Sequence, residues 1–132
     1  MPTIFLPMVP VPCPRPKFNR RTGSTYYPAR YSKWKVEASK KVRALALKAG
    51  LMAPLGGPLV VGLTFVFPRP KTTKLQFPKP DLDNLSKSAL DAGNGILWND
   101  DTQVTGLVAN KSWAAPGDPG YVQIDFTELP PV

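Results

Sequence analysis

Carboxylates crowd into one short stretch of a chain that is otherwise strongly basic. Of its nine acidic residues, a majority lie between positions 81 and 101, namely Asp81, Asp83, Asp91, Asp100 and Asp101. Neighbouring carboxylates stay ionised most readily when a cation joins them, and a divalent metal that prefers hard oxygen ligands suits them best. The cluster therefore predicts a metal site whose chemistry depends on aspartate oxygens.

The rest of the chain carries the opposite charge. The formal net charge is +8, and Glu37 is the single acidic residue among the many lysines and arginines of positions 1–50. A basic body with one acidic spot predicts a metal-dependent enzyme that acts on a polyanion, with nucleic acid as the favoured partner. A membrane partner is not expected, because the longest apolar run, residues 59–67, is too short to span a bilayer.

The absence of histidine removes whole classes of enzyme. With His 0 there is no Ser-His-Asp or Cys-His catalysis, and no His-ligated metal nuclease. Carboxylates, lysines and hydroxyls remain for any chemistry. Cys13 has no second cysteine to pair with, and the proline-interrupted N-terminus lacks the charged region of a signal peptide. We therefore expect a cytoplasmic protein.

A helix is expected to position most of the acidic residues. The run 81–95 places Leu82, Leu85, Ala89 and Ala92 on one face, and Gly93 or Gly95 ends it. Asp83, Lys87 and Asp91 then recur every fourth residue along the opposite edge. A short turn containing Trp98 can bring Asp100 and Asp101 back beside them.

Each acidic residue also has a structural explanation. Asp81 can cap the helix, Asp83 can pair with Lys87 four residues on, and Asp100 with Asp101 can form a turn. Stability alone does not require so many acids in so short a stretch. The spacing D-x-D resembles the start of an EF-hand, but Leu85, Ser86 and Ala92 occupy positions that an EF-hand gives to a ligand, a glycine and the closing glutamate. An EF-hand is therefore excluded.

The other elements predict one α+β domain over residues 1–132, with a mixed sheet of about four strands and two main helices. Pro28 starts a helix that Gly50 ends, with an apolar stripe of Tyr31, Trp34, Ala38, Val42, Leu45 and Ala49. The expected strands are an edge strand at 3–11, a buried strand at 59–67, and a strand at 121–126 that pairs with 103–111 across the turn 117–120. Residues 14–28 are expected to form a mobile arm or loop. Residues 68–80 are either a flap over the acidic site or an ordinary surface loop.

The acidic stretch resembles the RusA family of Holliday-junction resolvases, small nucleases of phage and prophage recombination. The resemblance rests on KPDLDNLSKSALDAGNGILWNDDTQV at positions 79–104, followed by Lys111. It is strong over about a quarter of the chain and follows the order of elements over the rest. The motif D-x-D-N-L-x-K, then an aspartate at the helix end, then W-x-D-D-x-Q-V, is far more specific than D-x-D alone.

The resemblance implies a homodimer that cleaves four-way DNA junctions with Mg²⁺, or with Mn²⁺ as a substitute, in a bacterial or phage-infected cell. Asp81, Asp83 and Asp101 would bind the metal, and Lys87 would be an essential basic partner. Asp91 and Asp100 match further acidic positions of the pattern. The basic residues expected at the DNA are Arg15, Lys17, Arg20, Arg21, Arg30, Lys33, Lys40, Arg43, Lys79 and Lys111.

Two other functions fit the same residues. A non-catalytic DNA-binding module would bind junctions in EDTA and cut nothing in Mg²⁺. A nuclease that prefers flaps or replication forks would differ in its substrate and not in its chemistry.

Overall fold

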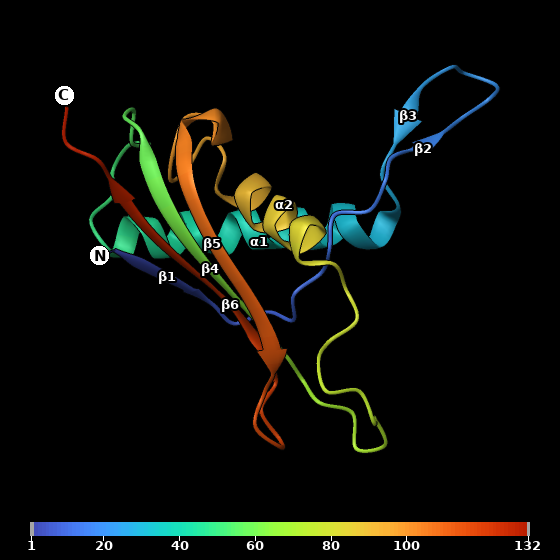
Figure 1. Cartoon of the computed structure of the whole chain (residues 1–132). Coiled ribbons are helices and arrows are strands. Elements are labelled where there is room, and N and C mark those ends of the chain that lie inside the picture. Colours follow the sequence, from blue (N-terminus) through green and yellow to red (C-terminus); the bar gives the residue numbers. More distant parts are fainter. Residues whose placement is uncertain (1, 132) are drawn as a thin grey trace.

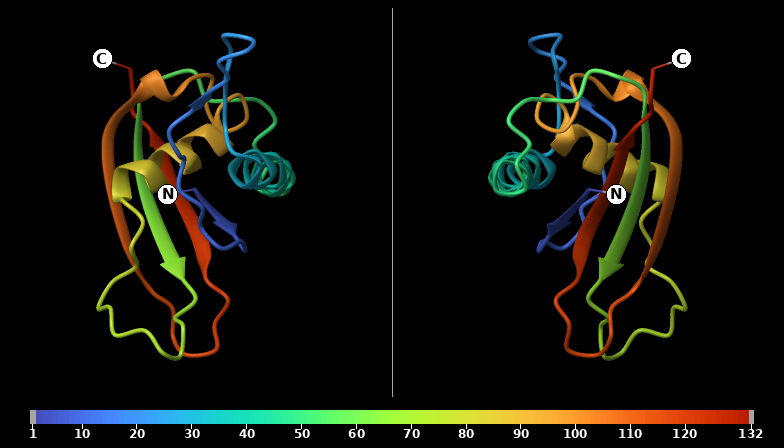
Figure 2. Two further views of the ribbon diagram at one scale, coloured as in Figure 1. Left: turned by 90° about the vertical axis from the view of Figure 1, so that its right-hand side faces the viewer. Right: turned by 90° about the vertical axis from the view of Figure 1, so that its left-hand side faces the viewer.

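Alternating burial along the strands shows a sheet that is covered on one face only. The computed structural model describes residues 2–131. Its main sheet has the strand order β1-β6-β4-β5, and both helices lie against the same face (Figures 1 and 2). The strands are β1 (Thr3–Leu6), β4 (Leu59–Phe67), β5 (Val104–Trp113) and β6 (Tyr121–Glu128), and the helices are α1 (Ala29–Lys48) and α2 (Leu82–Gly93). The expected α+β architecture is confirmed.

The core lies between this face and the two helices. Val61, Leu63 and Phe65 of β4 are buried under α1 and α2, whose own inward side chains include Val42 and Leu85. Strand β4 pairs with β5 on one side and with β6 on the other, so it is the most enclosed strand. Its bounds agree with the sequence expectation because Pro58 and Pro68 enclose a β-branched, aromatic run that is short for a helix.

The expected pairing of the last two strands is wrong. Strand β5 pairs in parallel with β4, whereas β6 pairs antiparallel with β4 and with β1. The connection between β5 and β6 therefore passes over the end of β4 and does not form a tight hairpin. Gly120 makes this crossing at φ 84°, where a Cβ atom would lie 2.5 Å from the carbonyl oxygen of Val66. Only glycine allows the backbone to approach so closely.

The N-terminal segment departs from the expectation in two places. Strand β1 is at the sheet edge, as predicted, but it ends at Leu6 because Pro7 has no N–H to continue the ladder. The basic arm is an antiparallel hairpin of β2 (Lys17–Phe18) and β3 (Thr25–Tyr26), and it projects from the body (Figure 1).

Helix α1 follows its predicted stripe except at the last turn. The helix ends at Lys48, so Ala49 is exposed, and Ala46 takes the buried position after Val42. No helix in the part of the chain that the structure describes is long and apolar enough to cross a membrane.

Candidate active site

Helix α2 presents its charged residues along one edge. Leu85, Ala89 and Ala92 are fully buried against the sheet and α1, which turns Asp83 and Lys87 outward. Asp91 lies two turns beyond Asp83 on the same edge, roughly 12 Å along the helix axis. The predicted positions of these residues along one edge of α2 are confirmed. The length of helix between Asp83 and Asp91 separates the two ends of the acidic cluster.

The first two acidic residues stand at the start of α2 and keep their carboxylates accessible. Asp81 occupies the N-cap position, but its side chain makes no capping hydrogen bond. One oxygen of Asp83 accepts a hydrogen bond of 3.0 Å from the backbone N–H of Asn84. Neither carboxylate has an ion-pair partner within residues 2–131. The structural explanations of Asp81 as a cap and of Asp83 as the partner of Lys87 are therefore not realised.

A turn fixed by hydrogen bonds follows α2 and reverses the direction of the chain. The indole N–H of Trp98 donates to the side-chain oxygen of Asn94 at 2.8 Å, and the N–H of Gly95 donates to the carbonyl of Trp98 at 2.8 Å. Trp98 is completely buried and packs edge-on against Phe126. Its ring lies so close to the helix end that a Cβ atom at Gly93 would be 2.8 Å from it. This packing directs the next residues back along α2.

Gln103 anchors the turn that carries the second acidic pair, Asp100 and Asp101. The short helix η1 (Asp101–Gln103) follows Asp100, whose backbone N–H donates to the side-chain oxygen of Gln103 at 2.8 Å. The amide nitrogen of the same side chain donates to the carbonyls of Leu55 and Gly57, each at 2.9 Å. Sequence reasoning gave Gln103 no role. Its signal was the capping-box spacing D-x-x-Q within the motif.

Asp101 lies within electrostatic reach of Lys87 and Asp91, in the middle and at the end of α2. Burial, and then the neighbouring carboxylates of Asp100 and Asp91, raise the pKa of Asp101 above its ordinary value, whereas the Lys87 ammonium lowers it. These four groups come from α2 and from the turn that follows it. Asp101 thus lies in an excess of negative charge that a cation would relieve.

Asp91 is held by a residue of the other helix. The hydroxyl of Tyr31, which is 2% exposed, donates to Oδ2 of Asp91 at 2.8 Å. Burial and this hydrogen bond raise the pKa of Tyr31 far above its ordinary value, so the phenol stays protonated as a donor. Sequence reasoning assigned Tyr31 only to the apolar stripe of α1.

The donor set suits Mg²⁺ without forming a complete cage. No three acidic residues within positions 2–131 lie close enough together to hold a metal ion by themselves. Asp81 and Asp83 stand at one end of α2, and Asp91, Asp100 and Asp101 lie toward the other. Mg²⁺ prefers carboxylate oxygens and is often held by one or two of them together with water and substrate phosphates. The accessible carboxylates and the raised pKa of Asp101 fit such a site.

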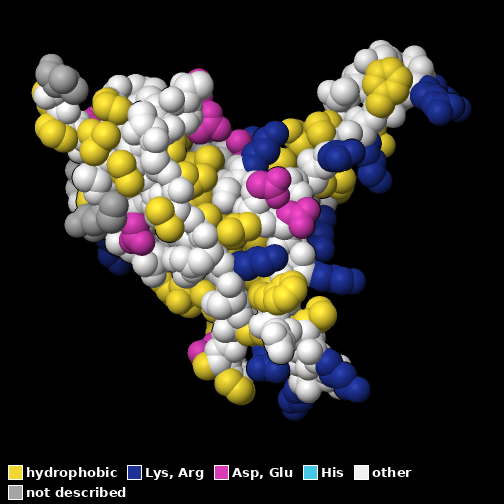
Figure 3. Space-filling model, viewed as in Figure 1, with side chains coloured by type: hydrophobic (Ala, Val, Ile, Leu, Met, Phe, Trp, Pro, Cys, Tyr) yellow, Lys and Arg dark blue, Asp and Glu magenta, His cyan; other side chains and the backbone are white. Residues whose placement is uncertain are grey.

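Basic side chains surround the acidic row, which consists of Asp81, Asp83, Asp91, Asp100 and Asp101. Figure 3 shows acidic side chains in a row over α2 and the turn before β5, with lysines and arginines beside it, on the hairpin and on the loop 68–80. The exposed residues among the predicted DNA contacts are Arg15, Lys17, Arg20, Arg21, Arg30, Lys33, Lys40, Arg43 and Lys79.

Lys111 differs from these exposed residues. It is half-buried, its ammonium donates to the carbonyl of Pro80 at 2.7 Å, and it lies 5.6 Å from the ring centre of Phe77. The indole N–H of Trp113 holds the same loop through the carbonyl of Leu75 at 3.0 Å. Lys111 therefore ties the loop 68–80 to β5 directly before Asp81.

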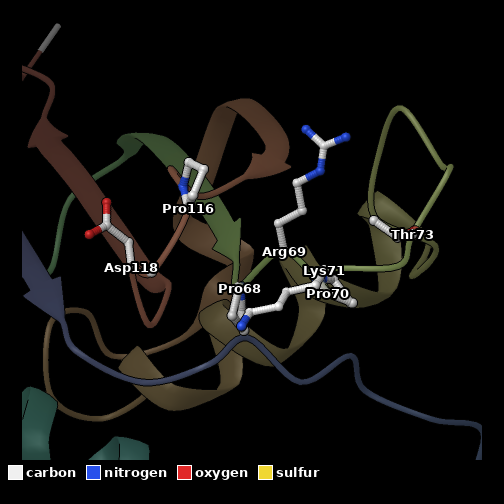
Figure 4. A pocket seen from close by; sticks show the side chains of 8 residues that line it. Pro68, Arg69, Pro70, Lys71, Thr73, Pro116 and Asp118 are labelled. Carbon is white, nitrogen blue, oxygen red and sulfur yellow. The ribbon is translucent and has the colours of Figure 1, made fainter.

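A hollow of about 610 Å³ lies away from the acidic row. It is formed by the loop after β4 and by the connection between β5 and β6, with Arg69, Lys71 and Asp118 among its lining residues (Figure 4). Asp118 is its single carboxylate, so the hollow does not share the acidic chemistry of α2.

Comparison with known proteins agrees with the motif. The family profile described as endodeoxyribonuclease RusA matches residues 7–124, which is nearly the whole chain. The chain has no match among curated proteins.

Proposed function

Because the chain belongs to the RusA endodeoxyribonuclease family, it is a phosphodiester hydrolase that resolves Holliday junctions, and we propose that α2 and η1 carry its active site. In this proposal Asp81, Asp83 and Asp101 hold one or two Mg²⁺ ions, with Mn²⁺ as an alternative, and Lys87 acts on the scissile phosphate. The observation that carries the proposal is that Lys87 of α2 lies close enough to Asp101 of η1 for its ammonium to act against the rise in the pKa of that carboxyl.

The chemistry of each group supports a separate role. When bound, Mg²⁺ polarises a phosphoryl oxygen and lowers the pKa of an attacking water. Asp81 and Asp83 have accessible oxygens that are not used in capping or ion pairing, so they are available as ligands. Substrate phosphate would complete a set that the carboxylates of one chain leave open.

Lys87 is suited to stabilise the charge that develops on the phosphate. Its side chain is exposed, and it forms no ion pair within 4.0 Å among the described residues. An ammonium that is not neutralised by a protein carboxylate remains available to an incoming phosphate oxygen. Placed in the water-poor space under bound DNA, such a group stabilises a transition state far more than it would in bulk water.

The remaining acidic residues would set the field around Asp101. Asp91, fixed by Tyr31, and Asp100, which caps η1, both raise the pKa of Asp101. Their charge favours a cation next to Asp101. We propose that they act by positioning and by charge, and that they do not accept the scissile phosphate directly.

A homodimer would supply the second cut. A four-way junction is resolved by paired cuts on strands related by a two-fold axis, which a C₂ dimer with one site per subunit matches. The uncovered face of the sheet supports such a contact, because Phe5 is 50% exposed and Val108 is 69% exposed there. The working compartment would be the cytoplasm of a bacterial or phage-infected cell, where the junction forms.

Cleavage of a labelled synthetic four-way junction tests the proposal. We expect symmetric nicks in Mg²⁺, none in EDTA, and a dimeric mass by light scattering. Flap and fork substrates in the same assay establish whether the junction is preferred. Binding without cleavage in Mg²⁺ or Mn²⁺ would reduce the protein to a DNA-binding module.

A further inference from the structure

The hairpin arm, residues 17–26, is ordered by its own bonds and not by packing on the body. Asn19 organises its tip: its side-chain oxygen accepts from the N–H of Arg21 at 2.9 Å, and its own N–H donates to the carbonyl of Ser24 at 2.8 Å. Gly23 closes the turn at φ 72°. The arm therefore presents a defined surface although it stands apart from the sheet and helices (Figure 1).

Two aromatic side chains on the arm face solvent. Phe18 is 60% exposed and Tyr26 is 49% exposed, and neither ring stacks on another within residues 2–131. Phe18 pairs with Thr25 and Lys17 pairs with Tyr26, so the two rings lie on opposite faces of the ribbon. A hairpin of two residue pairs is marginal on its own, and rings that are about half exposed or more give it little packing. Their exposure indicates a surface that is completed by a partner.

The charge of the arm selects the partner. Lys17, Arg20 and Arg21 are exposed, and the segment 14–28 contains no acidic residue. An apolar protein surface would leave these cations without counter-charges, whereas nucleic acid offers phosphates for the cations and flat bases for the rings. Duplex DNA keeps its bases stacked. A four-way junction in its open form interrupts this stacking at the branch point, so the faces of the base pairs there are accessible to an aromatic ring.

The root of the arm leads directly to the acidic row. Tyr27, which follows β3, packs edge-on against Tyr31 at 5.4 Å between ring centres. Tyr31 in turn donates its hydrogen bond of 2.8 Å to Asp91. Two successive contacts thus join the root of the arm to Asp91 of the acidic row. DNA that binds at this row would therefore pass close to the base of the arm.

We propose that this arm recognises the branch point of the junction. Phe18 and Tyr26 stack on the base faces that are accessible there, and Arg20 and Arg21 hold the adjoining phosphates. The inference rests on the proposed function for its substrate, and it assigns the preference for branched over linear DNA to the two aromatic rings.

The first experiment compares binding of the whole protein to a four-way junction and to a linear duplex of equal length, in EDTA so that no cutting occurs. Stacking of one base on an aromatic ring corresponds to about 5- to 150-fold in affinity. We expect Phe18→Ala and Tyr26→Ala each to weaken junction binding within this range and to leave duplex binding unchanged. Leu47→Ala is the matched control, because Leu47 is 52% exposed at the far end of α1.

Two further variants separate stacking from other interactions. Phe18→Trp should keep the parental preference for the junction, whereas Phe18→Leu should lose it although it stays apolar. The combined Arg20→Ala and Arg21→Ala variant should reduce the dependence of log affinity on log salt by about 0.9 for each phosphate that is no longer neutralised, and Phe18→Ala should not change that slope.

The inference is overturned if Phe18→Leu binds like the parent, if junction and duplex binding fall equally, or if the aromatic variants change the oligomeric mass. The last result would mean that the arm contacts a second copy of the chain. A parent that binds junctions but does not cut them in Mg²⁺ contradicts the active site alone. The arm experiments are read in EDTA, so their outcome does not depend on cleavage.

Discussion

The phenolic oxygen of Tyr31 lies 2.8 Å from Oδ2 of Asp91, a residue 60 positions further along the chain. This hydrogen bond joins the start of α1 to the end of α2, and it holds a half-buried carboxylate that raises the pKa of Asp101. The orientation of the acidic row therefore depends partly on a residue that its own sequence segment does not contain.

Tyr31→Phe should lower both stability and activity. A hydrogen bond to a charged group contributes roughly 1.5–3 kcal/mol, and because Asp91 is partly solvated we expect a loss of about 1–2 kcal/mol in urea unfolding. Junction cleavage should slow without being abolished. Tyr27→Phe is the control, since the hydroxyl of Tyr27 makes no hydrogen bond within residues 2–131. Equal effects of the two substitutions would remove Tyr31 from the site.

Asp81→Asn, Asp83→Asn and Asp101→Asn should each abolish junction cleavage. Each substitution replaces a proposed carboxylate ligand with a neutral amide, and it also removes a negative charge that faces DNA, so binding should be unchanged or tighter. Gel-shift and cleavage assays on the same junction measure both. Asp118→Asn, in the exposed turn before β6, should cut normally. Near-parental cleavage by any two of the three site variants contradicts the proposed ligand set.

Lys87→Ala should leave stability almost unchanged while slowing cleavage at least about a hundredfold. Loss of a preorganised group that stabilises transition-state charge typically costs about 3 kcal/mol, whereas a surface pair contributes only about 0.3–0.5 kcal/mol. The control is Lys41→Ala, because Lys41 does form such a pair with Glu37 at 3.7 Å. Thermal melts measure the change in stability of each variant, and single-turnover rates measure the change in its cleavage step. If Lys87→Ala cuts at the parental rate, or is inactive only because it unfolds, the lysine is structural.

Asp101 should link metal binding to pH. Because its pKa is raised in the folded chain, ionisation of Asp101 opposes folding above that pKa, and this penalty disappears at low pH where folded and unfolded chains are both protonated. Without divalent metal, Asp101→Asn should therefore melt above the parent at about pH 8 and close to it at about pH 3. Added Mg²⁺ should raise the melting temperature of the parent and not of the variant. The opposite order in EDTA would mean that Asp101 is stabilised as a carboxylate.

Gln103→Glu should damage the protein more than Gln103→Ala. In the parent, the amide nitrogen of Gln103 donates hydrogen bonds to the carbonyls of Leu55 and Gly57. The glutamate keeps the size of the side chain but directs an ionised oxygen toward these carbonyls. We expect about 1–3 kcal/mol of destabilisation for alanine and more for glutamate, with partial recovery of the glutamate variant as the pH falls and it protonates. Urea unfolding at two pH values measures this. A harmless Gln103→Glu would contradict the proposed role as an anchor.

Local sequence patterns predicted most of the elements and the type of chemistry. Periodic apolar residues predicted α1, α2 and β4, because burial of one face is a local property that is written at spacings of two to four residues. The same periodicity placed Asp83, Lys87 and Asp91 on one edge of α2, and the motif continuing through Asp101 predicted the family that the profile match confirms.

Which segments contact each other depends on packing in three dimensions. Strand β5 pairs with β4 and not with β6, since enclosing β4 between two strands buries more apolar surface than a terminal hairpin would, and no local turn signal encodes that choice. The hydrogen bonds of Tyr31 with Asp91 and of Gln103 with Leu55 likewise join positions that are distant in the chain. Each exists because a buried polar group must find a partner, and only the packed fold determines which partner is within reach.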